Sequence, residues 1–331
     1  MPASPDGAPP TVSVALCTYN GAPYVRQQLV SILAQTVPPA EVIVSDDGST
    51  DRTVELVRAV WERQRPPGTT LRLLVNETPL GVVRNFEQAM GACAGEVIAL
   101  SDQDDMWRPD KLELMLAQFG ARPDLGVLFT DARLVDDDGQ PFGSLFAALE
   151  ISSADLAAFG SGAAFGTLLR RNLATGATML LRRSLLDAAR PFPAIWVHDE
   201  WLAILAAATS TIDWLPERLI DYRQHSRNQI GAAKPTLRRK ISKVLEPRAD
   251  RYELLAARAD VLVERLDELG ADPAVIELAR RKAAHERFRA ALPASRPRRV
   301  RAVLAADRAG DYAAFSSRGR ADVLRDLLQP Q

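Results

Sequence analysis

The stretch Glu96–Trp107, EVIALSDQDDMW, decides the fold that this sequence predicts. Its first half, Val97–Leu100, is a short apolar run without a period, the pattern of a strand buried on both faces. Side chains two residues apart on a strand point the same way, so Asp102 and Asp104 share one side of the strand's carboxyl end. Two such carboxylates repel each other unless a cation lies between them, and a divalent ion is the usual solution. The alternative is a solvated acidic turn that caps the next helix.

Strand-like and helix-like segments alternate upstream of this stretch. Apolar runs predict strands, and apolar residues at helical spacing behind capping residues predict helices. The expected strands are 11–18, 41–45 and 71–75, and the expected helices are 24–35, 52–65, 82–94 and 109–119. This alternation predicts an α/β fold, a Rossmann-like and mostly parallel sheet flanked by helices on both faces.

The pattern is less regular after residue 125. Strands are expected at 127–135, 178–181, 212–215 and 219–222, and a helix at 201–208, whereas 142–165 has no clear period. Beyond residue 231 the chain is helical, with breaks near Pro247, Gly270, Pro293 and Gly310. The expected organisation is a flexible lead over 1–10, an α/β domain over 11–231 and an α-helical region over 232–331.

The charge is divided unevenly along the chain. Residues 1–230 carry 19 basic and 28 acidic side chains, a difference of −9, and residues 231–331 carry 22 and 14, a difference of +8. Such asymmetry suggests that the C-terminal region meets something anionic, a membrane surface or an acidic partner. The alternative is that its arginines solvate the outer faces of helices.

The composition, with 47% hydrophobic and 25% charged residues, is that of an ordinary globular protein. The two cysteines, Cys17 and Cys93, form no CxxC or zinc pattern, which favours a reducing compartment. No secretion signal and no apolar run of about 18 residues is present. We therefore expect a cytoplasmic location.

Three strand ends of the predicted sheet carry polar clusters: Thr18-Tyr19-Asn20, Asp46-Asp47 and Asp102-Gln103-Asp104. Ligands of doubly wound sheets bind at the carboxyl ends of the strands. Neither the Gly-rich dinucleotide fingerprint nor a P-loop occurs, so a bound diphosphate needs another source of positive charge. A metal held by Asp102 and Asp104 would supply it.

Four segments in this order, VSVALCTYNGAPYVRQQLVSILAQT, EVIVSDDGSTDRT, NETPLGVVRNFEQA and SDQDDMW, carry a resemblance. The chain resembles family 2 glycosyltransferases of the GT-A fold over about residues 11–231, and in particular rhamnosyltransferase-like bacterial members. The resemblance implies a donor-nucleotide site formed by Thr18, Tyr19, Asn20, Asp46, Asp47, Arg84 and Asp102. The alternatives are a turn and helix cap for 46–51, and a helix-surface arginine for Arg84.

The resemblance also implies a divalent cofactor, Mg²⁺ or Mn²⁺. Asp104 would ligate it directly, Asp102 would contact the ribose or make a second contact, and His225 would be a further ligand. Asp105 would instead cap the following helix. The alternative for His225 is a polar surface residue in a loop.

The segment Val197–Leu202, VHDEWL, stands where this family has a Glu-Asp or His-Asp motif, which makes Asp199 the catalytic base. The alternatives are that Asp199 caps the helix that starts at Glu200, or that Glu200 is the base. The segment 172–179, NLATGATM, would face the acceptor. Further residues near the diphosphate or acceptor would be His198, Arg223, Arg227 and Trp107, the last as a wall of the site.

The implied function is inverting, metal-dependent transfer of one sugar to a hydroxyl of a cell-surface polysaccharide or lipid-linked glycan precursor. Rhamnose from dTDP-rhamnose is the specific expectation. The alternatives are a UDP-hexose donor, or an inactive sugar-nucleotide-binding or scaffold protein. A sugar nucleotidyltransferase would need a Gly-rich basic loop that the first strand lacks. The expected partners are a nucleotide-sugar donor, the glycan acceptor, an anionic membrane surface and a second copy bound through the C-terminal helices, but no nucleic acid.

Overall fold

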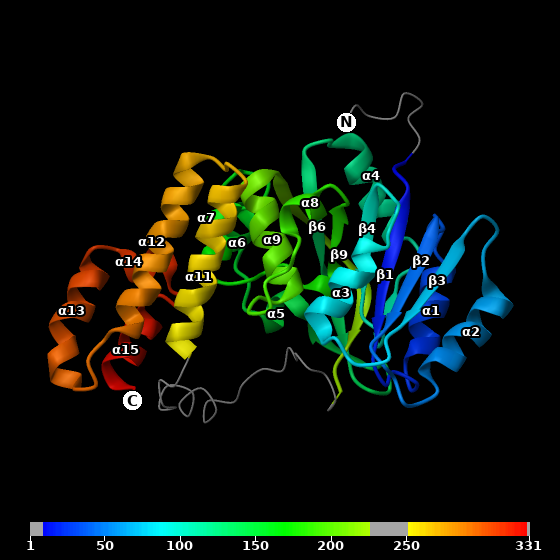
Figure 1. Ribbon diagram of the computed structural model, residues 1–331, viewed down its shortest axis with the longest axis horizontal. Coiled ribbons are helices and arrows are strands. Elements are labelled where there is room, and N and C mark those ends of the chain that lie inside the picture. Colours follow the sequence, from blue (N-terminus) through cyan, green and yellow to red (C-terminus); the bar gives the residue numbers. More distant parts are fainter. Residues whose placement is uncertain (1–8, 226–250, 330–331) are drawn as a thin grey trace. The chain divides into compact units, whose positions relative to one another are not determined.

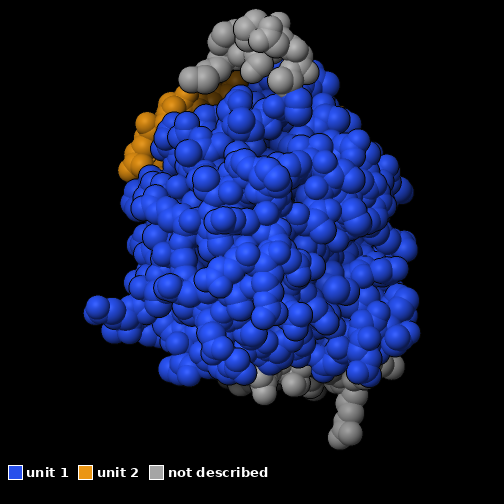
Figure 2. All heavy atoms as spheres, turned by 90° about the vertical axis from the view of Figure 1, so that its right-hand side faces the viewer, with its two compact units in different colours: residues 1–160, 173–232 blue, residues 161–172, 233–331 orange. Residues whose placement is uncertain are grey.

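The computed structural model describes residues 9–225 and 251–329, which divide into two compact units (Figure 1). Unit 1 comprises residues 1–160 and 173–232, and unit 2 comprises 161–172 and 233–331 (blue and orange in Figure 2). The segment 161–172, expected in the first domain, therefore belongs to the C-terminal unit. The reason is that α7 (Ala164–Arg170) contacts α12 (Pro273–Ala290) and α14 (Asp311–Phe315), and most of its side chains are buried.

Unit 1 is built on a mixed sheet. Its nine strands within the described residues run in the order β3-β2-β1-β4-β8-β6-β9-β5, with β7 paired to β6. The strands are β1 (Val12–Thr18), β2 (Glu41–Asp46), β3 (Thr70–Val75), β4 (Val97–Ser101), β5 (Met106–Trp107), β6 (Leu125–Val135), β7 (Pro141–Ser144), β8 (Leu180–Arg182) and β9 (Thr211–Arg223).

The helices of unit 1 follow the strands as the sequence predicts in the first half of the unit. They are α1 (Val25–Leu33), α2 (Thr53–Gln64), α3 (Val82–Gly91), α4 (Lys111–Ala121), α5 (Leu145–Ala148), α6 (Ser153–Ala157), α8 (Leu185–Ala189) and α9 (His198–Thr209), with a 3-10 helix η1 (Gly176–Thr178). The prediction of an α/β sheet flanked by helices is confirmed. The stretch 142–165, without a period in the sequence, contains several short elements.

The first four strands are parallel and bring three loops to one edge of the sheet. Thr18 pairs with Asp46 across β1 and β2, and Leu16 pairs with Ser101 across β1 and β4. Every residue of β1 and β4 is buried, as their apolar runs predict. The carboxyl ends of these strands therefore lie side by side.

The second half of the sheet differs from the expected parallel order. β8 is antiparallel to both β4 and β6, and β9 is one strand of 13 residues where two short strands were expected. The pairing of β9 with β6 skips from Leu215 to Arg218, so that Pro216 lies in a bulge. Proline has no N–H to contribute to a ladder, which explains why the sequence reads as a break there.

Unit 2 is helical, as expected. Besides α7, α12 and α14 it contains α11 (Arg251–Glu268), α13 (Arg296–Arg308) and α15 (Arg320–Leu328). The expected breaks at Gly270, Pro293 and Gly310 fall between helices, and Pro247 lies outside the described residues. No helix in the described part of the chain is long and apolar enough to cross a membrane.

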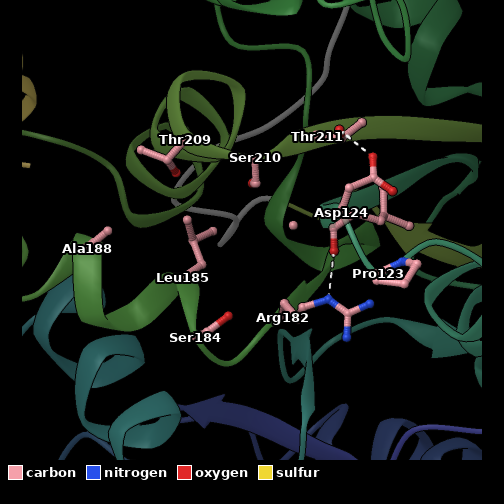
Figure 3. A pocket seen from close by; sticks show the side chains of 11 residues that line it. Pro123, Asp124, Arg182, Ser184, Leu185, Ala188, Thr209, Ser210 and Thr211 are labelled. Atoms are coloured by element: carbon pink, nitrogen blue, oxygen red, sulfur yellow. Dashed lines mark hydrogen bonds between the residues drawn. The ribbon is translucent and has the colours of Figure 1, made fainter. Parts of the chain in front are cut away.

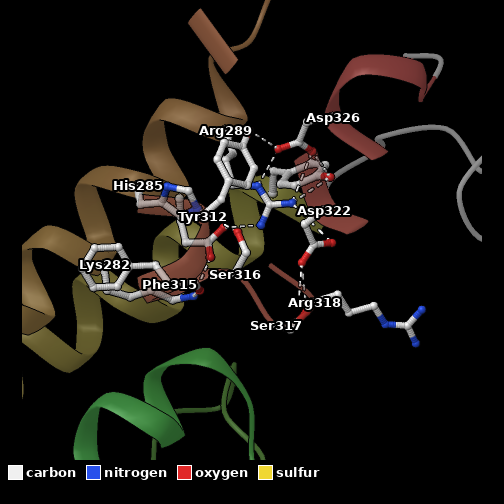
Figure 4. A network of polar contacts seen from close by, with 12 residues as sticks. Lys282, His285, Arg289, Tyr312, Phe315, Ser316, Ser317, Arg318, Asp322 and Asp326 are labelled. Atoms are coloured by element: carbon white, nitrogen blue, oxygen red, sulfur yellow. Dashed lines mark hydrogen bonds and ion pairs between the residues drawn. The ribbon is translucent and has the colours of Figure 1, made fainter. Parts of the chain in front are cut away.

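A buried ionic network ties the helices of unit 2 together (Figure 4). The Asp326 carboxylate of α15 accepts hydrogen bonds from Tyr252 of α11 at 2.6 Å, and from Arg289 of α12 and Tyr312 of α14 at 2.7 Å each. Asp326 is fully buried, and Arg289 is 4% exposed. Four helices thus share one buried carboxylate.

Candidate active site

The first polar loop is held in place by the end of β2. The Thr18 hydroxyl donates to Asp46 at 2.6 Å, and the Ser49 backbone N–H and hydroxyl donate to the same carboxylate at 2.8 and 2.6 Å. Asp46 is fully buried. Its carboxylate therefore orders the loop 46–49, and both of its oxygens accept hydrogen bonds from protein groups.

The loop at 19–22 is tied down on its other side as well. Asn20 has a φ of 48°, and its side-chain oxygen accepts from the Thr50 N–H at 2.9 Å. The Gly21 N–H donates to the Thr53 hydroxyl at 2.8 Å. The Tyr19 side chain, in contrast, is 45% exposed. An exposed aromatic side chain on a fixed backbone is suited to stacking against a nucleobase.

Asp47 holds the start of α3. Its carboxylate accepts from the N–H groups of Leu80 at 2.6 Å and Gly81 at 2.9 Å, and from the Asn76 amide at 3.1 Å. Like Asp46, it is used by protein donors. The expected nucleotide contact Arg84 is half exposed and its guanidinium donates to Glu87 at 2.5 Å.

A group of carboxylates gathers beyond the end of β4. Burial and the negative charges of Asp104 and Asp199 together raise the pKa of Asp102 to about 7, against the opposing effect of the Lys111 ammonium. Two residues separated by nearly 100 positions therefore act on the same carboxyl group. Clustered negative charge of this kind fits a site that receives a cation.

Asp104 and His225, both expected as metal ligands, lie side by side. His225 Nε2 is 2.9 Å from Asp104 Oδ2, and the imidazole stacks on the Tyr24 ring with centroids 4.6 Å apart at 9°. Across residues 9–225 and 251–329, no group of three or more His, Cys, Asp or Glu side chains is already spaced to hold a metal ion. A carboxylate oxygen and an imidazole nitrogen side by side nevertheless fit Mg²⁺ or Mn²⁺, which keep positions for water and substrate phosphate.

Arg223 was expected near the diphosphate, but the structure uses it differently. It is 4% exposed, and its guanidinium donates to the Asp104 carbonyl at 3.0 Å, the Asp137 carbonyl at 2.7 Å and the Gln27 side chain at 2.8 Å. The buried guanidinium thus binds the acidic loop to two other segments. Its role here is to hold that loop.

Asp105 does not cap the following helix, which corrects an expectation from the sequence. One of its carboxylate oxygens accepts from the Arg223 N–H at 3.0 Å, and the residue is 2% exposed. The helix α4 begins only at Lys111, with Asp110 at its N-cap position. Buried at the junction with β9, Asp105 is too far back in the chain to reach that helix end.

Asp199 lies in the first turn of α9, whose N-cap position is Val197. Its Oδ2 accepts from the Gly176 N–H at 2.9 Å, and its Oδ1 accepts from the Glu200 N–H at 2.6 Å. The helix therefore starts before Asp199, and the carboxylate binds η1 rather than serving as the N-cap. A carboxylate oxygen has two lone pairs, so each one keeps acceptor capacity for a substrate proton.

His198 lies behind Asp199. Its ring stacks on Phe86 with centroids 3.9 Å apart, and neither ring nitrogen has a hydrogen-bond partner among the described residues. Burial lowers the pKa of His198 to about 3, which keeps the imidazole neutral. The buried ring of His198, at the start of α9, packs against α3.

Two residues that the sequence analysis did not assign complete the site. Lys111 is fully buried, with Nζ 3.9 Å from the Trp107 ring centroid and donating to the Ala177 carbonyl at 3.1 Å. Trp107 is thus part of the core beneath the carboxylates. The Gln103 side chain forms hydrogen bonds with the Tyr19 backbone. Arg227, an expected contact, lies outside the described residues.

A separate depression of about 370 Å³ lies at the other end of the sheet (Figure 3). Arg182 and Asp124 are its charged residues. Arg182 donates to the Leu125 carbonyl at 3.1 Å, and Asp124 accepts from the Thr211 hydroxyl at 2.7 Å. Since Arg182 pairs with Val97 at the amino end of β4, this pocket is remote from the carboxylate cluster.

Comparison with known proteins places the chain in a family. Residues 13–188 match the family model described as glycosyl transferase family 2. An uncharacterized protein of Mycobacterium tuberculosis is 30% identical over 218 residues, which are 65% of this chain and 59% of that protein. A chondroitin synthase of Pasteurella multocida is 34% identical over 131 residues, 39% of this chain and 13% of that protein. The matched part thus spans less than two thirds of either relative.

Solved structures share the fold. TarS of S. aureus, in complex with UDP-GlcNAc, has a TM-score of 0.58 at 18% identity and covers 96% of this chain and 89% of its own. The mannosyltransferase PcManGT from Pyrobaculum calidifontis, in complex with GDP-Man and Mn²⁺, has a TM-score of 0.52 at 20% identity, covering 98% of this chain and 87% of its own. At these identities the likeness shows the fold alone.

Proposed function

We propose, from the premise that the chain belongs to glycosyl transferase family 2, that it moves one sugar from a nucleotide-sugar donor to an acceptor hydroxyl. The observation that carries this proposal is the convergence of Asp102, Asp104, His225 and Asp199 at one edge of the sheet. An exposed Tyr19 ring stands at the same edge, where β1 and β2 end. This edge therefore offers a suitable group for the nucleoside, for the diphosphate and for the proton of the acceptor hydroxyl.

The donor would lie with its base against Tyr19 and its diphosphate toward Asp104 and His225. A divalent ion bound by these two side chains would supply the positive charge that a departing diphosphate requires. Mn²⁺ in the complex of the archaeal mannosyltransferase supports a divalent ion here. Asp102 would contact the ribose or the ion, and Asp46 and Asp47 would shape the nucleoside loops.

Asp199 would act as the general base. Its carboxylate would take the proton of the acceptor hydroxyl as that oxygen forms a bond to the anomeric carbon. The bond from this carbon to the diphosphate breaks, and the diphosphate leaves with the electron pair. One displacement of this kind inverts the anomeric configuration. The hydrogen bonds from Gly176 and Glu200 fix the orientation of the carboxylate for this step.

For the donor we propose rhamnose as dTDP-rhamnose, and for the acceptor a hydroxyl of a cell-surface polysaccharide or a lipid-linked glycan precursor. The support is the resemblance of the ordered motifs. A UDP-hexose is the alternative donor, and an inactive sugar-nucleotide-binding protein is the alternative function. UDP-GlcNAc and GDP-Man in the structural neighbours favour a nucleotide-sugar in either case.

Thermal-shift measurements with UDP, dTDP and GDP, each with Mn²⁺, Mg²⁺ or EDTA, test this proposal. A specific nucleotide at a hundredfold excess over its Kd stabilises the protein by about 2.7 kcal/mol. We expect one nucleotide to do so with the ion and to do so less in EDTA. Hydrolysis of the matching nucleotide-sugar then separates an enzyme from an inactive binder. A protein that responds to none of the three nucleotides contradicts the proposal.

We also propose a peripheral contact of unit 2 with an anionic membrane. Val300 and Leu304 of α13 are 40% and 37% exposed. They lie among exposed arginines that make no side-chain ion pair or hydrogen bond within the described residues: Arg296, Arg298, Arg301 and Arg308. Basic residues near anionic lipid contribute about 1 kcal/mol each, and aliphatic side chains favour a lipid surface over a soluble polyanion.

Flotation of the full chain with phosphatidylcholine vesicles, with and without phosphatidylglycerol, tests this contact. We expect binding that needs the anionic lipid, weakens with salt, and is lost when Arg298, Arg301 and Arg308 are replaced by Gln. Replacing Arg58, Arg63 and Arg65 of the α2 region by Gln is the matched control. A chain that ignores anionic vesicles at low salt leaves a homodimer through the C-terminal helices as the alternative, which sedimentation would detect.

A further inference from the structure

Gln103, the middle residue of the acidic motif, reaches across to the backbone of the first loop. Its Oε1 accepts from the Tyr19 N–H at 2.8 Å, and its Nε2 donates to the Tyr19 carbonyl at 3.0 Å. The two residues are 84 positions apart in the sequence. The side-chain amide thus binds both polar groups of one residue, as a neighbouring strand would. Only Asn and Gln carry a donor and an acceptor that allow this.

The chain leaves room for this contact at Gly21. A Cβ on Gly21 would lie 2.0 Å from Gln103 Oε1 and 2.4 Å from Gln103 Cδ. Gly21 is absent from the residues with a positive φ, so its backbone conformation is open to any residue. Glycine is needed here for space, and the space is filled by the Gln103 amide.

We infer that Gln103 is a positioning residue for the donor: it holds the Tyr19 backbone so that the exposed ring is presented to the nucleobase. The inference rests on the proposed function of this edge as a nucleotide site. Tyr19 has 45% of its surface exposed, and its fixed backbone sets the direction of the Cα–Cβ bond from which the ring extends. Gln103 contributes to base binding without touching the nucleotide.

The position of Gln103 also connects the two halves of the donor site. Its neighbours in sequence, Asp102 and Asp104, belong to the carboxylate cluster, and Asp104 lies 2.9 Å from His225. The loop that carries Asp102 and Asp104, proposed to face the diphosphate, therefore also positions Tyr19, proposed to stack on the base. If Gln103 only stabilised this loop, replacing it would lower the stability of the protein. The nucleoside and the diphosphate contributions to nucleotide binding would then be weakened equally.

Nucleotide binding by Gln103→Ala separates these contributions. The probes are UMP, dTMP and GMP in EDTA, which report the nucleoside part, and UDP, dTDP and GDP with and without Mn²⁺, which report the ion-dependent part. We expect the Kd of the preferred monophosphate to rise roughly tenfold, as two lost hydrogen bonds would produce. The ratio of diphosphate Kd values with and without Mn²⁺ stays as in the wild type. Gln64→Ala, an exposed glutamine at the end of α2, is the control.

Donor hydrolysis gives a second readout. Gln103→Ala should raise KM for the nucleotide-sugar by the same roughly tenfold factor and leave kcat nearly unchanged, since uniform binding is lost. Equal monophosphate affinity in the variant and the wild type would overturn the inference. A Gln103→Ala protein that loses only the Mn²⁺-dependent part would overturn it as well.

A double-mutant cycle with Gly21 tests the contact itself. Gly21→Ala in the wild-type background should weaken monophosphate binding about as much as Gln103→Ala does, because the new methyl group displaces the Gln103 amide. Added to Gln103→Ala, the same change should have little further effect, since the atoms it would meet are gone. Additive effects in binding and in thermal stability would contradict the contact. If the wild type binds none of the nucleotides, the proposed function is wrong. The double-mutant cycle measured by thermal stability then still tests the contact between Gln103 and the loop at Gly21.

Discussion

At the scale of single residues, we propose Asp199 as the base because of the groups that surround its carboxylate. Backbone N–H groups of Gly176 and Glu200 hold it, and its charge is close enough to raise the pKa of Asp102. It lies beyond residues 13–188, the part that matches the family model. Its assignment as the base therefore rests on the resemblance of the segment Val197–Leu202 and on the effect of its charge on Asp102, which lies within the matched part.

Asp199→Asn should lower the rate of donor turnover by about 10²–10⁴-fold, the usual contribution of a general base. Asparagine keeps the size and one oxygen acceptor but removes the basic lone pairs. Nucleotide affinity should remain close to that of the wild type. Asp187→Asn, at an exposed aspartate of α8, is the matched control. A variant that keeps more than about a tenth of the wild-type rate would leave Asp199 with a structural role only.

Residue types and spacing predicted the acidic motif, but not the contacts that its side chains make with other segments. Asp102, Asp104 and Asp199 were expected because carboxylates follow a buried strand or match a family motif. Gln103 was not singled out, since its contact with Tyr19 joins loops 84 residues apart. The lone lysine of α4, Lys111, looks in the sequence like a side chain that extends to solvent, yet it is fully buried. Pairings that depend on tertiary packing leave no local signal.

At the scale of elements, β1, β2 and β4 were predictable because each is an apolar run followed at once by polar residues. The order of the later strands was not, since a short apolar run such as β8 reads the same in either direction. Pro216 made one strand look like two. The assignment of α7 to unit 2 was also hidden, because its apolar side chains do not reveal which core they enter.

The helices of unit 2 allow a prediction that does not depend on function. Asp326→Asn should lower the free energy of unfolding of the full chain by about 1–3 kcal/mol, because Arg289 would lose the nearest of three buried counter-charges, the others being Asp322 and Glu286. Chemical denaturation followed by circular dichroism measures this loss. Glu277→Gln, at an exposed position of α12, is the control. A loss below about 1 kcal/mol, the range of surface pairs, would mean that the network carries little stability.

The same network should respond to acid. Burial pushes the pKa of Asp326 upward, but the hydrogen bonds from Arg289 and the two tyrosines lower it below its usual range. A lowered carboxyl pKa contributes stability above the unfolded pKa, about 4, and this is lost as the pH falls through the folded value. The difference between wild type and Asp326→Asn should therefore be complete near neutral pH and shrink below about pH 4. A difference independent of pH would contradict the charge-based account.

At the scale of the whole molecule, we propose that unit 1 binds the nucleotide and that unit 2 binds the anionic membrane. Unit 1 contains the carboxylate cluster and all of the family match except residues 161–172, and unit 2 contains the exposed arginines of α13. The charge asymmetry in the sequence, −9 before residue 231 and +8 after it, follows the same division. Nucleotide binding and vesicle binding should thus be separable by variants in one unit or the other.

Calorimetric titration tests most directly whether Asp104 binds the donor diphosphate through a divalent ion. The preferred nucleoside diphosphate is titrated into wild type and Asp104→Ala, with Mn²⁺ and with EDTA. We expect Mn²⁺ to tighten binding to the wild type and to have no effect on binding to the variant, while the affinities measured in EDTA remain similar. Asp138→Ala, at an exposed aspartate of the turn after β6, is the control. An Asp104→Ala protein whose affinity rises with Mn²⁺ as much as that of the wild type would contradict the claim that this edge of the sheet binds the donor diphosphate.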